Sequence, residues 1–169
     1  MTTDNYSILI GKLDEFIRKY YKNRLVRGGI FFIALLTIFF LVIILSEYFG
    51  RFNTVTRTVI FYSYISLNVL ILWQLILIPA FNLLKLGKII SHEEAAGIIG
   101  THFPEINDKL LNTLQLKMLQ DQNPEISGDL IRASIDQKIN KLRPVPFVLA
   151  IDIKQNLRYL RYALPPVII

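Results

Sequence analysis

Two long segments of the chain, residues 28–45 and 59–84, contain no Asp, Glu, Lys or Arg. An α-helix rises about 1.5 Å per residue, so roughly 20 mostly apolar residues cross the hydrocarbon core of a bilayer. Each segment reaches that length once the aromatic residues at its ends are included. We therefore predict an all-α membrane protein with a two-span transmembrane hairpin at residues 28–84, its spans at about 28–48 and 59–84.

The basic residues beside these segments predict how the chain crosses the membrane. Several precede the first span and two follow the second directly, whereas the predicted connection at residues 46–58 holds only Arg51 and Arg57. The positive-inside rule then places the N-terminus and both ends of the hairpin in the cytoplasm. The candidate membrane-flanking residues are Arg18, Lys19, Lys22, Arg24, Arg27, Lys85, Lys88, Lys154, Arg158 and Arg161.

Residues 1–27 have the pattern of an amphipathic basic helix. Apolar and aromatic side chains recur at three- and four-residue spacing, so they share one helix face, and charged side chains populate the other. Two interpretations remain open: the helix lies on the inner leaflet, or it packs against the later cytoplasmic helices. The apolar face consists of Tyr6, Leu9, Ile10, Leu13, Phe16, Ile17, Tyr20 and Tyr21.

Residues 85–162 are the one large polar segment, and we predict that they form a small cytoplasmic helical bundle. Ser91 and Glu94 have the spacing of a capping box, so a short helix is expected at 92–99, with Gly100 as its left-handed C-terminal cap. Pro104 suits the first position of a second helix. A turn is expected at Asn123 and Pro124, because proline favours an extended residue before it.

Two further helices are expected in this bundle. The third has an apolar stripe at helical spacing, formed by Ile131, Ile135, Ile139 and Leu142. The last is expected to begin at Phe147 and to run toward the membrane, with Leu149, Ile153, Leu157, Leu160 and Leu164 as its inner face.

The end of the chain resembles the entry into another span. Lys154, Arg158 and Arg161 share one helix face, and residues 164–169 are apolar. We therefore expect residues 163–169 to start a truncated third transmembrane span, which would make this chain the N-terminal piece of a longer protein.

No motif in the sequence indicates catalysis or a cofactor. His92 and Glu93 begin like a zinc-protease helix, but the second histidine that the motif needs is replaced by Ala96. A Walker sequence and a nucleophile elbow are also absent from the sequence. The net charge of +6 is explained by the membrane flanks, so nucleic acid is not expected as a partner. We predict that the chain is not an enzyme and has no metal and no cofactor, and the sequence identifies no small-molecule substrate.

The segment at residues 100–105 is the most distinctive turn. Its simpler interpretation is a helix-to-helix connection stabilised by packing of Phe103. The alternative is a partner-docking turn formed by His102, Phe103, Pro104 and Glu105.

Four strings together resemble the N-terminus of a family of large, helix-rich Bacteroidota inner-membrane proteins of unknown function. They are residues 12–23 (KLDEFIRKYYKN), 99–106 (IGTHFPEI), 108–116 (DKLLNTLQL) and 161–166 (RYALPP). The resemblance implies a third span after Pro166, a long helix-rich exterior region and a location in the bacterial inner membrane. It brings no catalytic residues with it.

These observations predict a multi-pass anchor or scaffold module of a larger envelope protein. The alternatives are a cytoplasmic docking or signalling module on a membrane hairpin, and an accessory subunit of a transporter complex. The expected partners are the lipid bilayer and another protein or a second copy, because Asn68, Gln74 and Asn82 place amides in the second span, where they pair with neighbouring helices.

Overall fold

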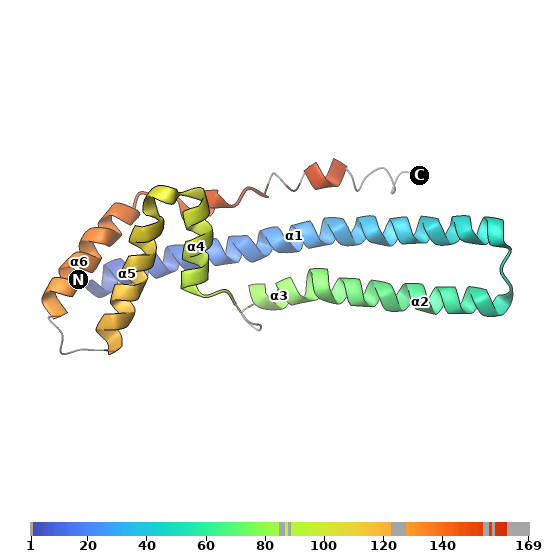
Figure 1. Ribbon diagram of the computed structural model, residues 1–169, viewed down its shortest axis with the longest axis horizontal. Coiled ribbons are helices and arrows are strands. Elements are labelled where there is room, and N and C mark those ends of the chain that lie inside the picture. The colour runs from blue at the N-terminus through green and yellow to red at the C-terminus, as the bar shows by residue number, and fades with distance from the viewer. Residues whose placement is uncertain are drawn as a thin grey trace. The chain divides into compact units, whose positions relative to one another are not determined.

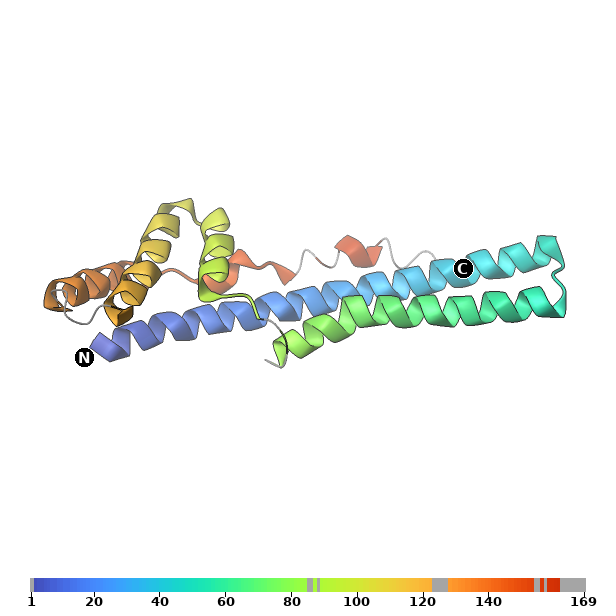
Figure 2. The same cartoon turned by 60° about the horizontal axis from the view of Figure 1, so that its bottom comes forward.

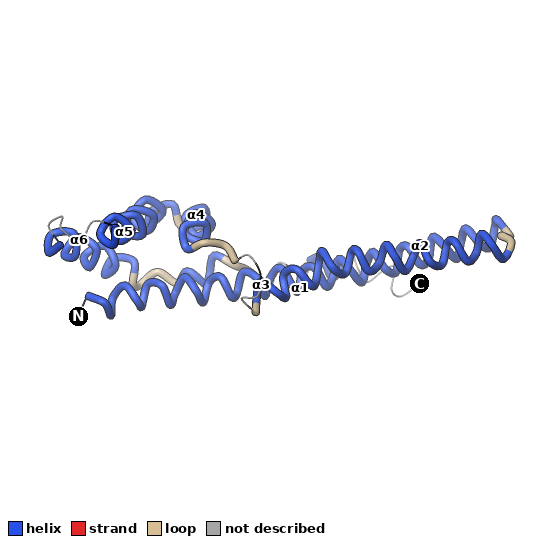
Figure 3. Tube along the Cα trace, turned by 90° about the horizontal axis from the view of Figure 1, so that it is seen from below, coloured by secondary structure: helices blue, strands red, loops and turns tan. Residues whose placement is uncertain are grey.

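The computed structural model describes residues 2–84, 87, 89–122, 128–153, 156 and 158–161, and no strand occurs among them (Figure 3). The prediction of an all-helical chain is therefore confirmed over this part. The elements, in chain order, are α1 (Thr2–Gly50), α2 (Thr54–Leu72), a π-helix (Trp73–Leu77), α3 (Ile78–Leu83), α4 (His92–His102), α5 (Pro104–Gln122), α6 (Gly128–Leu142) and a 3₁₀-helix (Phe147–Ala150) (Figure 1).

The chain divides into two compact units, each formed from two stretches of sequence. The first unit comprises Met1–Tyr20 and Ile89–Ile151, and the second comprises Tyr21–Lys88 and Asp152–Ile169. Each unit thus combines part of α1 with segments that are distant in sequence.

Helix α1 corrects the prediction of a separate N-terminal helix at residues 1–27. It has 49 residues and continues without a break past Gly28 and Gly29. Both neighbouring segments are strongly helical, and no proline separates them, so two glycines do not end the helix. At about 1.5 Å per residue its length exceeds the roughly 30 Å hydrocarbon core of a bilayer, so part of α1 lies outside any membrane that it crosses.

In the first unit, the apolar face of α1 is buried within the protein. Leu9, Leu13, Phe16 and Ile17 are all buried, and Asn5 donates to Asp136 of α6 over 3.3 Å. The choice left open by the sequence is thereby decided in favour of packing against the later helices. The rest of the core consists of Ala95, Ala96, Ile99, Ile106, Leu110, Thr113, Leu114, Ile135, Ile139, Leu142, Phe147, Ala150 and Ile151.

The predicted start of α4 is confirmed, but its predicted end is wrong. The Ser91 hydroxyl accepts from the Glu94 backbone N–H over 3.1 Å, and the Ser91 N–H donates to the Glu94 carboxylate over 3.2 Å. Gly100 is not a left-handed cap, because α4 continues to His102 and no described glycine has a positive φ. Gly100 is instead buried in the helix, where a Cβ would collide with the Asn107 side chain of α5.

Two glycines of α4 therefore make a matched test of its packing on α5. Gly100→Ala is expected to lower the free energy of unfolding by about 1–3 kcal/mol, because its Cβ would lie 2.8 Å from the Asn107 Cβ. Gly97→Ala is expected to raise it by up to about 1 kcal/mol, because nothing lies within 4 Å of a Cβ there. Thermal unfolding of the full chain in detergent, followed by circular dichroism, measures both, and shifts of the same sign would contradict this packing.

The segment after α6 also differs from its prediction. Pro146 leads into the 3₁₀-helix, and the backbone is extended at Ile151, so no continuous helix runs from Phe147. Leu149 was predicted to face inward but is 69% exposed, whereas Phe147 and Ile151 are buried. The stripe of α6 is confirmed at Ile135, Ile139 and Leu142; the side chain of Ile131 and the predicted turn at residues 123–124 lie outside the described part.

In the second unit, α1 and α2 run side by side as a hairpin (Figure 1, Figure 2). Two helical stretches, Asn5–Gly50 and Thr54–Leu83, are long and apolar enough to cross a membrane. The predicted connection at residues 46–58 is too long, because helix continues on both sides of it and only residues 51–53 link α1 to α2. Asn53 makes this short link possible by capping α2, since its side chain accepts from the Thr56 N–H over 2.9 Å.

Candidate functional site

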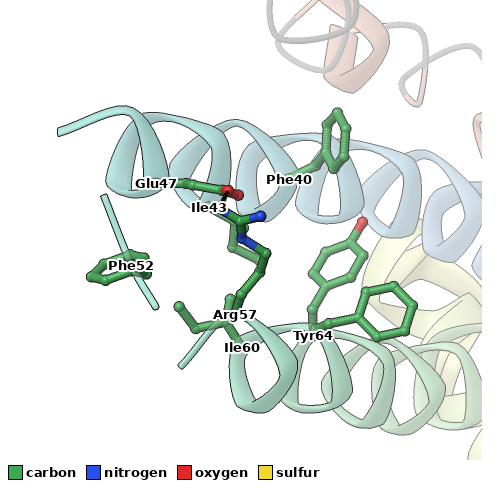
Figure 4. Close-up of a pocket in the computed structure, with 8 residues that line it drawn as sticks. Phe40, Ile43, Glu47, Phe52, Arg57, Ile60 and Tyr64 are labelled. Atoms are coloured by element: carbon green, nitrogen blue, oxygen red, sulfur yellow. Dashed lines mark ion pairs between the residues drawn. The ribbon is translucent and has the colours of Figure 1, made fainter. Parts of the chain in front are cut away.

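One cavity of the hairpin lies at its turn end, between the last turns of α1 and the first turns of α2 (Figure 4). Its volume is about 170 Å³. The walls are mostly apolar and include Phe40 and Ile43 from α1, Phe52 from the link, and Ile60 and Tyr64 from α2.

One ion pair and one hydrogen bond join the two helices around this cavity. The Arg57 guanidinium lies 2.7 Å from the Glu47 carboxylate, and both side chains are partly exposed. The Tyr64 hydroxyl donates to the Leu36 carbonyl over 3.2 Å. These groups hold two helices together and include no nucleophile with an adjacent base, so the cavity has the chemistry of an apolar contact site.

Most of the predicted membrane-flanking residues are described, and most of these are exposed. Arg18, Lys22, Arg24 and Arg27 on α1 are exposed, as are Arg158 and Arg161. Lys19 differs, because its ammonium donates to the Val148 carbonyl over 2.7 Å within the first unit. The remaining three, Lys85, Lys88 and Lys154, lie outside the described residues, as does the predicted third span at 163–169.

A pair of asparagines that the sequence analysis missed joins α1 to the C-terminal segment of the second unit. The Asn156 side chain is buried, and its amide donates to the Asn23 side-chain oxygen over 2.6 Å. Three residues later, the Tyr159 ring lies 5.2 Å from the Phe31 ring and 4.9 Å from the Arg27 guanidinium. Asn156 contacts residue 23 and Tyr159 contacts residues 27 and 31, so these two residues meet α1 in the order of its own sequence.

The predicted docking turn is a tight connection between α4 and α5. Phe103 is the single residue between the helices, and its N–H donates to the Ile99 carbonyl over 2.9 Å. Phe103 is half-buried, whereas His102, Pro104 and Glu105 are exposed. Pro104 opens α5, as its sequence position predicted. The geometry accounts for a connection, and docking at the exposed residues stays a prediction.

The zinc-like helix start has a structural role in the first unit. His92 Nε2 lies 3.0 Å from Asp14 of α1. Within the described ranges, no group of three or more His, Asp or Glu side chains is arranged to hold a metal ion.

Burial raises the pKa of the Tyr6 hydroxyl, and the Asp121 carboxylate raises it further, so this tyrosine is a poor source of phenolate at neutral pH.

No protein-family model, no curated protein and no solved structure matches this chain.

Proposed function

We propose that this chain is a membrane anchor and scaffold module, in which a transmembrane hairpin holds a helical domain at the cytoplasmic face of the bacterial inner membrane. The observation that carries the proposal is a contrast between the two units. The first buries apolar side chains in a core, whereas the second has exposed apolar side chains from Val26 to Phe49 on α1 and from Val55 to Leu70 on α2.

The exposed apolar surface of the hairpin is too large for an aqueous protein. Only 6% of the most apolar window of each candidate span is buried, whereas the core helix of a soluble protein would be mostly buried. Soluble monomers rarely expose contiguous apolar patches beyond a few hundred Å². Lipid is the cover that suits such a surface on every side, and the helices satisfy their own backbone hydrogen bonds there.

The ends of the hairpin support the same placement. Tyr48 and Phe49, at the turn end, are strongly exposed, and aromatic residues favour the interface between bilayer and water. Arg24 and Arg27 mark the opposite end of the first apolar run, which favours the cytoplasm for that side.

The proposal includes a third span after residue 161. Asn156 and Tyr159 contact α1 in the order of its own sequence, and Arg158 and Arg161 repeat the basic flank that precedes the first span. A span continuing that direction would cross from the cytoplasm outward. This is the arrangement that the resemblance to the Bacteroidota envelope proteins implies, and it suits an anchor for an exterior region.

A second candidate function is docking of a cytoplasmic protein on the first unit. The observation that favours it is the exposure of His102, Pro104 and Glu105 at the connection between α4 and α5. Loss of a co-purifying partner on His102→Ala, with unchanged membrane insertion, would favour docking over a purely structural role.

Membrane topology is tested with single cysteines, because the chain has no native cysteine to react. Three exposed positions are chosen: Val55 in α2, Leu67 within the apolar run, and Gln137 in α6. A membrane-impermeant maleimide applied to spheroplasts is expected to label Val55→Cys only. Gln137→Cys should react only after lysis, and Leu67→Cys should react in neither case.

Two results would overturn the proposal. Labelling of Gln137→Cys in intact spheroplasts would reverse the orientation, and labelling of Leu67→Cys in intact membranes would show that the hairpin is not covered by lipid. Extraction of the protein from membranes by alkaline carbonate would also contradict a spanning hairpin.

A further inference from the structure

A second cavity of the second unit, of about 340 Å³, lies where α1 meets the π-helix. Arg24, Arg27 and Gly28 line it from α1, and Gln74 and Leu75 line it from the π-helix. Cavities of about 300–1,000 Å³ are the size that small ligands occupy. The basic side chains make this cavity chemically unlike the apolar one at the turn end.

Two residues shape the backbone around the cavity: Gly28, which has no Cβ, and Pro79, which has no backbone N–H. A Cβ at Gly28 would collide with the Leu75 carbonyl, so glycine lets the two helices approach there. Pro79 is buried and lacks an N–H, so it cannot donate to the Leu75 carbonyl four residues back. The helix widens into the π-form at Trp73–Leu77, a distortion that is frequent at functional sites.

The two arginines have the donors that a phosphate requires. They stand three residues apart, so they share a helix face. Neither forms an ion pair with a carboxylate of the described residues. The Arg27 guanidinium lies over the rings of Phe31 and Tyr159, at 5.6 and 4.9 Å, and such contacts leave its N–H donors free for a ligand.

The depth of the cavity matches the phosphates of a bilayer. Arg24 and Arg27 directly precede the apolar run that starts at residue 28, so they lie at the boundary between hydrocarbon and headgroups. Basic pockets between transmembrane helices on the cytoplasmic side bind anionic headgroups. Gln74 adds an exposed amide that donates to oxygen acceptors.

We infer that this cavity binds the phosphate group of an anionic phospholipid, with Arg24 and Arg27 as its principal ligands and Gln74 as a third donor. The inference rests on the proposed membrane hairpin and names its lipid partner. Binding there joins α1 to the π-helix on the cytoplasmic side, so the lipid stabilises the anchor where its two helices meet.

The test compares lipid binding by three double variants of the purified full chain in detergent, by native mass spectrometry. The probes are dioleoylphosphatidylglycerol, which is anionic, and dioleoylphosphatidylcholine, which is zwitterionic. Arg24→Gln with Arg27→Gln is expected to weaken phosphatidylglycerol binding at least about tenfold, because two charge-assisted contacts are lost. Arg18→Gln with Lys22→Gln removes the same charge from exposed positions of α1 outside the cavity, and should change binding less than about threefold.

The third variant separates geometry from charge. Arg24→Lys with Arg27→Lys keeps both charges but removes the planar forks, so an intermediate loss is expected. Equal losses in the two glutamine variants would overturn the inference, since they would show only diffuse attraction to the basic flank. Equal binding of both lipids by the unmodified chain would also overturn it.

Two controls separate this inference from its alternatives. Inorganic phosphate at 10 mM, about a hundredfold above the Kd of a site of about 0.1 mM affinity, should not displace the lipid; displacement would assign the cavity to a soluble phosphate instead. An error in the proposed transmembrane hairpin is detected independently, because Leu67→Cys would then be labelled by maleimide in membranes. Circular dichroism of each variant reports whether it is folded. Loss of phosphatidylglycerol binding in a variant that still folds and inserts assigns the lipid to this cavity.

Discussion

Replacement of Phe16 by Ala is expected to destabilise the first unit by about 3–5 kcal/mol. The Phe16 side chain is fully buried, on the face of α1 that also buries Leu13 and Ile17. Small domains are stable by only about 5–15 kcal/mol, so this loss is a large fraction of the total. The expected result is rapid trypsin cleavage within α5 and α6 of the full chain in detergent, where the unmodified protein resists.

The control is Glu15→Ala, at the exposed neighbouring position of α1. It removes a charge but no buried atom, so its effect should stay within about 0.5 kcal/mol. If residues 1–20 instead lay on the lipid surface, Phe16→Ala would weaken binding to vesicles and leave the trypsin resistance of α5 unchanged. That outcome would refute the packing of α1 in the first unit.

Helical periodicity predicted much of the first unit because burial repeats with the helix. The face of α1 that holds Leu9, Leu13 and Phe16 is the buried one, and Ile135 and Ile139 of α6 are buried as well. The capping box at Ser91 could be predicted equally well, since both of its partners lie within four residues. The sequence did not determine whether α1 would pack against protein or lipid, because both environments accept the same apolar stripe.

The incorrect predictions depend on contacts between different elements of the fold. Gly100 fits a helix end in isolation, but the nearby Asn107 side chain makes it a close-packing position inside α4. The segment after α6 is apolar enough for a helix, yet Lys12 donates to the Arg143 and Val145 carbonyls, which hold it in another conformation. The two Lys12 contacts bridge more than a hundred positions, and the local sequence pattern does not reveal them.

The candidate sites also combine a part that the local sequence pattern predicts with a part that depends on packing between helices. Arg24 and Arg27 were predicted to flank a membrane from their position beside an apolar run. The cavity that they line could not be predicted, because it also requires Gly28 on α1 and the widened turn around Leu75. Composition and spacing therefore identified basic groups at that depth, but only the packing of α1 on the π-helix makes them line a pocket.

Gly28→Ala is expected to push α1 away from the π-helix, with a loss of about 1–3 kcal/mol in hairpin stability. Its Cβ would overlap sterically with the Leu75 carbonyl oxygen and would lie 3.1 Å from the carbonyl carbon. These are backbone atoms, so no rotamer change relieves the collision. The matched control is Gly29→Ala, where nothing lies within 4 Å of a Cβ and alanine is the better helix former.

Cross-linking between α1 and α2 measures the separation of the two helices. Leu36→Cys and Tyr64→Cys form a suitable pair in the cysteine-free chain, because the Tyr64 side chain reaches the Leu36 carbonyl. A short bismaleimide should join them more slowly when Gly28→Ala is added and at an unchanged rate with Gly29→Ala. Equal rates in both backgrounds would contradict the close approach.

Because Gly28 also lines the arginine cavity, Gly28→Ala should weaken phosphatidylglycerol binding although both arginines remain.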